Sequence, residues 1–432
     1  MVAIPGSGTR PTSQFSPRAR HPATVASRLL ALGIVLLFAA APADAQKTTF
    51  NPSISIGFAY TDNVQYLDQP GPTTGDTAVT AGVVLPLVRL IDQGALRLTY
   101  GANRLAYQDE GQFDNTEQRV SFDFFRLNRR QSTWRVTTRY VKSDEQTSPI
   151  LPTDIVPDQT EGPDDADLSL TSRTDRETID ARVGYDWRIG PAWGLNVGFA
   201  AGESTFSGGT DVEDRTWWGP SVSMRNTISR RTSLGAGYNF RRVDLDTGGS
   251  EDFQQLDVFF DRGLSRAVQF ELHVGGFTRS PEDSKSETSV FGTANVRFNN
   301  GLTLGPVRLD FLAGVSPSKG GALTGTSLNS TAGFSISGVR TYPVNWRIGS
   351  SYNHRSPFES GEPTTETLRV AAGVEPKISR LMGLRFASSY TEQTSEDPTL
   401  EATYTQARLT LVIYPLGRNK ISGRQRSASV GG

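Results

Sequence analysis

The chain has 432 residues, with 44 Lys and Arg against 45 Asp and Glu, for a formal net charge of -1. A charge this close to zero gives no reason to expect a nucleic-acid partner. The chain has no cysteine, which excludes disulfides, thiolate metal sites, cysteine nucleophiles and a lipid anchor on cysteine. Its 43 glycines and 9% aromatic residues favour a protein of many strands and turns.

The first 45 residues are typical of an export signal. Three arginines between residues 18 and 28 precede an apolar run from Leu29 to Ala41, which is short for a membrane-spanning helix. Ala43-Asp44-Ala45 has the small residues of a signal-peptidase site. We therefore predict a signal peptide over residues 1–45, and an N-terminal anchor helix is the alternative.

From Pro52 onward, apolar and polar residues alternate in one segment after another. Ile179, Ala181 and Val183, for example, alternate with Asp180 and Arg182. A period of two indicates a strand with one apolar and one polar face, and about 9–11 such residues cross a bilayer when the strand is tilted. Eighteen such segments start near residues 52, 77, 95, 115, 131, 176, 192, 214, 232, 252, 267, 287, 302, 326, 343, 364, 381 and 402.

The connections between these segments alternate in length. Short turns are expected at 92–94, 128–130, 190–191, 230–231, 264–266, 299–301, 340–342 and 379–380. Long polar loops are expected at 61–76, 108–114, 144–175, 205–213, 245–251, 279–286, 316–325, 355–363 and 394–401. Outer-membrane barrels have short periplasmic turns and longer external loops, whereas a soluble β-sandwich has no reason to sort its loops in this way.

These patterns predict an all-β fold, a transmembrane antiparallel up-and-down β-barrel of about 18 strands (16–18). The barrel is expected over residues 46–416, with a polar C-terminal tail at 417–432. The expected location is the outer membrane of a Gram-negative cell, with both termini periplasmic. An interfacial aromatic girdle is the interpretation of the tryptophans near the strand ends, and an ordinary soluble β core is the alternative. These are Trp134, Trp187, Trp193, Trp217, Trp218 and Trp346.

The opening segment, Ile56-Gly57-Phe58-Ala59-Tyr60-Thr61-Asp62-Asn63-Val64, is followed by Gly75-Asp76-Thr77. This opening resembles that of the β-barrel porin type 2 family, as does the segment from Tyr140 to Ser148. The resemblance implies an outer-membrane barrel that occurs beside exopolysaccharide and exosortase (PEP-CTERM) systems, with a role near polysaccharide secretion. It implies no catalytic residues. The polar tail from Gly417 to Gly432 departs from barrels that end on an aromatic residue.

Because hydrocarbon accepts only the apolar face, the polar face of each strand is expected to line the barrel interior. The predicted pore-lining cations are Arg97, Arg135, Arg139, Arg182, Arg188, Arg225, Arg241, Arg297, Arg308, Arg347, Arg369, Arg385 and Arg408. The accompanying carboxylates are Asp123, Asp180, Asp186, Asp257, Asp261, Glu271, Asp310 and Glu375. This excess of cations favours passage of anions, and cross-strand ion pairs that only brace the wall are the alternative.

The longest loop, 144–175, is acidic. A candidate constriction carries Asp154, Asp158, Glu161, Asp164, Asp165 and Asp167, which would face the arginines if the loop folded inward. A solvated external loop is the other interpretation. The sequence Asp164-Asp165-Ala166-Asp167 lacks the spacing and the glycine of a calcium-binding EF-hand loop, so no metal site is predicted.

Two histidines, His273 and His354, follow the predicted signal peptide. No nucleophile-elbow, phosphate-loop or zinc-protease motif is present, so no catalytic residue is assigned and the sequence predicts no enzyme. A histidine within hydrogen-bond reach of a serine or aspartate at the rim would favour a membrane hydrolase instead.

The function expected from the sequence is a porin-like channel, for export of polysaccharide or for passive passage of small, mildly anionic solutes. A plugged structural or surface-binding barrel and an outer-membrane hydrolase are the alternatives. The expected partners are outer-membrane lipid and lipopolysaccharide, the barrel assembly machinery, and a polysaccharide or small anionic solute. No cofactor and no nucleic acid is expected.

Overall fold

The computed structural model describes residues 48–416. Within this range the gaps are 64–74, 92, 112–113, 129–131, 144–174, 208–213, 247–248, 266, 283–284, 303–304, 319–326, 339–343, 359–362 and 399–400. The chain divides into two units, Met1–Ala43 and Asp44–Gly432. The signal peptide predicted at 1–45 and the tail predicted at 417–432 lie outside the described residues, as do the six acidic residues of the candidate constriction.

The described residues form strands joined by turns and loops. The strands are β1 (Thr48–Phe50), β2 (Ser53–Thr61), β3 (Asp76–Ile91), β4 (Gly94–Tyr107), β5 (Asn115–Asn128), β6 (Ser132–Ser143), β7 (Asp175–Arg188), β8 (Trp193–Ser207), β9 (Arg215–Ser229), β10 (Thr232–Leu245), β11 (Ser250–Gly263), β12 (Val268–Pro281), β13 (Glu287–Leu302), β14 (Gly305–Ser318), β15 (Ser327–Gly338), β16 (Val344–Pro357), β17 (Thr365–Pro376), β18 (Met382–Ser395) and β19 (Ala402–Ile413). No helix within the described ranges is both long and apolar enough to cross a membrane.

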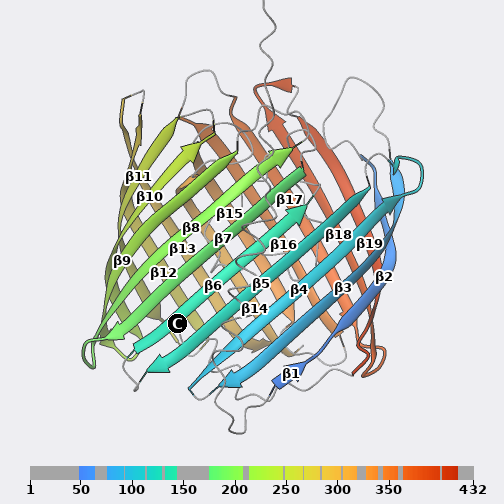
Figure 1. Cartoon of the computed structure of the whole chain (residues 1–432), viewed down its shortest axis with the longest axis horizontal. Coiled ribbons are helices and arrows are strands. Elements are labelled where there is room, and N and C mark those ends of the chain that lie inside the picture. The colour runs from blue at the N-terminus through green and yellow to red at the C-terminus, as the bar shows by residue number, and fades with distance from the viewer. Residues whose placement is uncertain are drawn as a thin grey trace, which may run out of the picture. The chain divides into compact units, whose positions relative to one another are not determined.

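The strands close into an 18-strand antiparallel barrel, as the sequence predicts. Each strand from β2 to β18 pairs with the next one, and β19 pairs with β2 to complete the circuit. Figure 1 shows that the strands are steeply tilted, which closure of a sheet requires. Closure leaves no open edge, so the backbone hydrogen bonds of these strands are satisfied within the sheet.

The first strand is interrupted at Pro52. β1 and β2 both pair with β3, through Phe50 opposite Leu87 and Ser53 opposite Val84, so they lie end to end along it. Because proline has no N–H to donate, the ladder is broken between them. The short β1 therefore extends the first barrel strand rather than adding a nineteenth to the circuit.

Each of the eighteen predicted segments begins within three residues of the strand that the structure shows. The strands β3 to β19 have 12–16 residues, which is enough for a tilted strand to cross a bilayer. One expectation is wrong. The turn expected at 299–301 lies inside β13, since Asn299-Asn300-Gly301 pair with Arg308, Val307 and Pro306.

The barrel has an apolar and a polar face. Large apolar side chains are exposed on the apolar face, for example Leu256 at 62% and Val258 at 51% on β11. The polar face instead carries buried polar side chains, among them Arg279, Arg355 and Gln393. Side chains converge on the concave side of a barrel and crowd one another, so we assign the polar face as the inner face and the apolar face as the outer face.

Five of the six tryptophans lie on the outer face, as the expected girdle requires, and one does not. Trp346 faces outward opposite Val374. Trp134, Trp187, Trp193 and Trp218 lie on the outer face and are 44%, 45%, 44% and 41% exposed. Trp217 points to the inner face, because adjacent residues of a strand face opposite sides. There it lies directly opposite Gly202, and the Arg241 guanidinium sits 4.3 Å from the centre of its ring. The sequence interpretation of Trp217 as a girdle residue is therefore wrong.

Candidate functional site

The strand register places all thirteen predicted arginines on the inner face. The pairings run without a change of face around the circuit, from Arg97 opposite Asp123 to Arg408 opposite Ala59. The eight predicted carboxylates lie on the same face. Arg308 is placed on this face by its backbone register alone, because its side chain is not among those that the structure describes.

At least five of these arginines form ion pairs with the predicted carboxylates. The distances from guanidinium nitrogen to carboxylate oxygen are 3.5 Å for Arg135–Asp186, 3.7 Å for Arg182–Asp180, 3.0 Å for Arg225–Asp261, 3.0 Å for Arg297–Asp310 and 3.1 Å for Arg385–Glu375. Four of these pairs join residues of one strand or of adjacent strands, and Arg225–Asp261 spans from β9 over β10 to β11. The pairs therefore run along the wall and none of the five crosses the interior.

An aromatic and charged cluster on β9 to β12 was not predicted from the sequence. Phe259 lies on the inner face, the Arg225 guanidinium is 5.2 Å from its ring centre, and the His273 ring stacks on it at 5.6 Å. Asp257 approaches His273 at 3.7 Å from Oδ2 to Nδ1. Val258-Phe259-Phe260 breaks the alternation, which hid the inward position of Phe259. The glycine at position 235, directly across the ladder, is the signal that could have revealed it.

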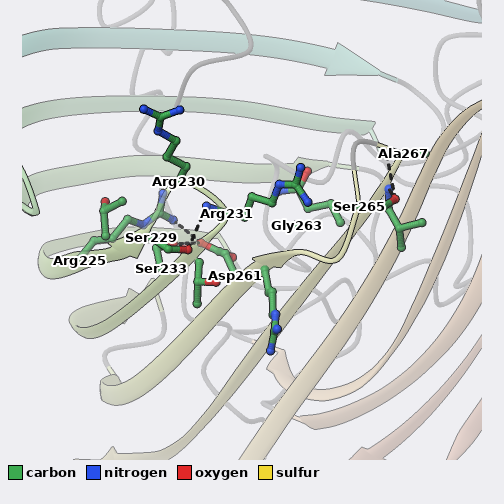
Figure 2. A pocket seen from close by; sticks show the side chains of 14 residues that line it. Arg225, Ser229, Arg230, Arg231, Ser233, Asp261, Gly263, Ser265 and Ala267 are labelled. Carbon is green, nitrogen blue, oxygen red and sulfur yellow. Dashed lines mark hydrogen bonds and ion pairs between the residues drawn. The ribbon is translucent and has the colours of Figure 1, made fainter.

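A pocket of about 360 Å³ opens beside this cluster, at the short-turn ends of β9 to β12 (Figure 2). Its lining includes four arginines: Arg225, Arg230, Arg231 and Arg262. Among the described lining residues Asp261 is the only acid; it accepts a hydrogen bond from Ser233 at 3.1 Å and forms an ion pair with Arg225 at 3.0 Å. The pocket therefore has an excess of positive charge and is suited to anions.

The second histidine, His354, lies on the outer face near the long-loop end of β16. Its Nε2 is 3.0 Å from Ser356 Oγ and its Nδ1 is 3.3 Å from Glu366 Oε1. His354 and Glu366 are directly opposite each other on β16 and β17. This is the arrangement, a histidine within hydrogen-bond reach of a serine at the rim, that favours a hydrolase over a purely passive barrel.

The comparisons with known proteins do not assign the chain to a family. No protein-family model and no curated protein matches the chain, so the resemblance to the β-barrel porin type 2 family is not confirmed. Among solved structures, the chain is similar to OpdQ of Pseudomonas aeruginosa, with 10% identity and a TM-score of 0.43 over 85% of this chain and 97% of that one.

It is also similar to OccAB3 of Acinetobacter baumannii, with 10% identity and a TM-score of 0.43 over 84% of this chain and 98% of that one. The outer membrane protein OpdK of Pseudomonas aeruginosa matches with 11% identity and a TM-score of 0.42 over 85% of this chain and 98% of that one. Likenesses of this degree carry no argument about function.

Proposed function

We propose that the protein is a porin-like channel of the outer membrane that passes small, mildly anionic solutes. The observation that carries the proposal is the inner face of the closed barrel, on which the register gathers thirteen arginines and eight carboxylates. An apolar outer face suits lipid and a charged inner face suits water, which is the pattern of a membrane pore.

Width and charge together support the anion preference. A barrel of 16–18 strands is about the size that leaves an aqueous channel. Charges on a wall of low dielectric act on passing ions more strongly than charges in bulk water, so an excess of fixed cations favours anions. The arginine-lined pocket at the short-turn ends of β9 to β12 adds to this field near one mouth.

The alternative of a plugged structural barrel has one observation in its favour, which is the ion pairing of five predicted arginines. Those pairs brace neighbouring strands along the wall, and none of the five reaches across the interior. We do not extend the proposal to polysaccharide export, because the family resemblance that implied it is not confirmed. In the proposed orientation the short turns, and with them both termini, face the periplasm.

The experiment is single-channel recording of the purified protein in a planar bilayer, with a potassium chloride gradient to read ion preference. We expect stable conductance steps and a reversal potential that favours chloride. A folded barrel that gives no conductance would contradict the pore.

A charge variant tests the arginines themselves. Replacing Arg182, Arg225 and Arg241 with glutamine removes three inner-face cations, so we expect the chloride preference to fall. Arg126→Gln is the matched control, because Arg126 pairs with Trp134 on the outer face. An unchanged preference in the triple variant would show that the arginines do not set it.

A further inference from the structure

A serine, a histidine and a carboxylate meet on the outer face where β16 and β17 approach their loop. Ser356 Oγ lies 3.0 Å from His354 Nε2, and Glu366 Oε1 lies 3.3 Å from His354 Nδ1. Each ring nitrogen therefore has its own partner, with the serine on one side and the carboxylate on the other. This is the connectivity of a nucleophile, a general base and a group that orients the base.

The partners decide which nitrogen carries the proton. An ionised carboxylate only accepts hydrogen bonds, so the Nδ1–H of His354 donates to Glu366. In the neutral ring Nε2 is then the acceptor, and the Ser356 hydroxyl donates to it. A histidine held in this tautomer can take the serine proton during nucleophilic attack.

The strands hold the three groups in place. His354 and Ser356 are two residues apart on β16 and so share one face, while the register sets Glu366 directly across from His354 on β17. Tyr352, on the same face, also hydrogen-bonds to the Glu366 carboxylate. His273 on the inner face is placed differently, because its Nδ1 lies 3.7 Å from Asp257 Oδ2 and its ring stacks on Phe259.

The surroundings of the three residues indicate the kind of substrate. The side chains of His354 and Glu366 are 32% and 49% exposed, so a substrate can reach them from outside the barrel. The next pair on the same face, further from the rim than His354 and Glu366, is Tyr352 and Leu368. These two side chains lie opposite each other and are 38% and 37% exposed. Polar groups at the rim and apolar side chains below them match the headgroup and the acyl chain of a membrane lipid.

We propose that Ser356, His354 and Glu366 form the catalytic site of an acyl-ester hydrolase that acts on membrane lipids. Ser356 Oγ attacks the ester carbonyl carbon while His354 Nε2 takes the hydroxyl proton. His354 returns this proton to the leaving alcohol as the carbon–oxygen bond breaks, which leaves an acyl group on Ser356. Water then attacks the acyl group and gives a proton to His354, and Ser356 regains a proton as the fatty acid departs. The net reaction consumes one ester and one water and yields one acid and one alcohol.

This activity goes beyond the proposed channel and does not depend on an open pore, so the two are measured separately. The test uses the purified full chain in detergent micelles, with p-nitrophenyl palmitate as the lipid-like ester and p-nitrophenyl acetate as the soluble ester. A fluorophosphonate probe reports whether Ser356 reacts covalently, with the labelled residue identified by peptide mass spectrometry.

We expect fluorophosphonate to label Ser356 and the palmitate ester to be hydrolysed faster than the acetate ester. Ser356→Ala is expected to abolish both labelling and hydrolysis, and His354→Asn to lower the rate by about 100-fold or more. Glu366→Gln keeps the size of the side chain but removes its charge, so a large loss of kcat with a smaller change in KM is expected.

Ser350→Ala is the matched control, because Ser350 lies on the same face of β16, opposite Phe334 and Val370 and away from His354. It should hydrolyse the palmitate ester at the rate of the unmodified protein. Heat-dependent migration on SDS gels verifies that every variant is folded. Hydrolysis that persists in folded Ser356→Ala, or a folded protein with neither labelling nor hydrolysis, would overturn the proposal. Hydrolysis of the acetate ester alone would overturn the assignment to lipids.

Discussion

At the scale of single residues, the inner wall is built from glycines matched to aromatic rings on the next strand. Gly202 lies opposite Trp217, Gly235 opposite Phe259, and Gly275 opposite Phe291. At each of these glycines a Cβ would come within 2.7 Å of the opposing ring. Glycine inside a strand ordinarily weakens it, and an aromatic side chain lying across the gap restores the lost packing.

Gly235 provides the residue-scale prediction. A Cβ there would lie 2.1 Å from Phe259 Cζ and 2.5 Å from the Met224 carbonyl oxygen, so Gly235→Ala must displace the ring or the backbone. We expect a loss of about 1–3 kcal/mol in folding free energy, measured by urea unfolding in lipid vesicles.

Gly184 on β7 is the control for this change. It lies on the same inner face, opposite Gly198 and Arg135, and a Cβ there would meet nothing within 4 Å. Gly184→Ala should therefore leave the free energy of unfolding close to that of the parent protein. An equal loss at both positions would show that backbone entropy, rather than the packing of Phe259, explains the effect.

At the scale of the strands, alternation decides which side chains meet lipid. On β11, Leu256 and Val258 are exposed on the outer face, while the neighbouring Asp257 and Phe259 lie on the inner face. One residue of slippage would exchange the two faces, so the register of a strand with one buried side is strongly specified. The alternation is local in the sequence, which is why strand positions and faces could be predicted without the structure.

Val258 near the middle of β11 tests the outer-face assignment. A charged side chain there would have to enter hydrocarbon. Val258→Arg is therefore expected to destabilise the barrel in vesicles, lowering the free energy of unfolding by about 2–4 kcal/mol. Gln255→Arg on the inner face of the same strand is the comparison and should have a clearly smaller effect, because Gln255 pairs with Asn239 and Phe277 on the polar side. If both changes lower the free energy of unfolding by the same amount, the faces are assigned incorrectly.

At the scale of the whole molecule, the seam between β2 and β19 joins the two ends of the sheet. The Asp62 Oδ1 atom accepts the Thr405 backbone N–H at 2.6 Å, and Asn63 Nδ2 donates to the Thr403 carbonyl at 3.3 Å. These contacts join residues about 340 positions apart in the chain. Because consecutive strands run in opposite directions, closure also brings the strand ends that border the short turns to one end of the barrel and those that border the long loops to the other.

Loop 144–175 provides the prediction at this scale. If it folds inward as an acidic constriction, replacing residues 146–172 with a short Gly-Ser linker widens the channel and removes negative charge from it. We then expect larger conductance steps and a stronger chloride preference in planar bilayers. Shortening the loop at 208–213 in the same way is the control and should change neither quantity. Conductance that stays the same after the first deletion would show that loop 144–175 does not narrow the pore.

The sequence by itself determined the fold class, the strand positions and the face on which each predicted arginine lies, because a period of two residues is a property of neighbours in the chain. Only the tertiary structure decided which residues meet across strands. Glu366 joins His354 and Ser356, and Asp261 reaches over β10 to Arg225, because the register of the closed sheet brings them together. No local pattern encodes that register, since it depends on backbone pairing between strands and on closure of the circuit.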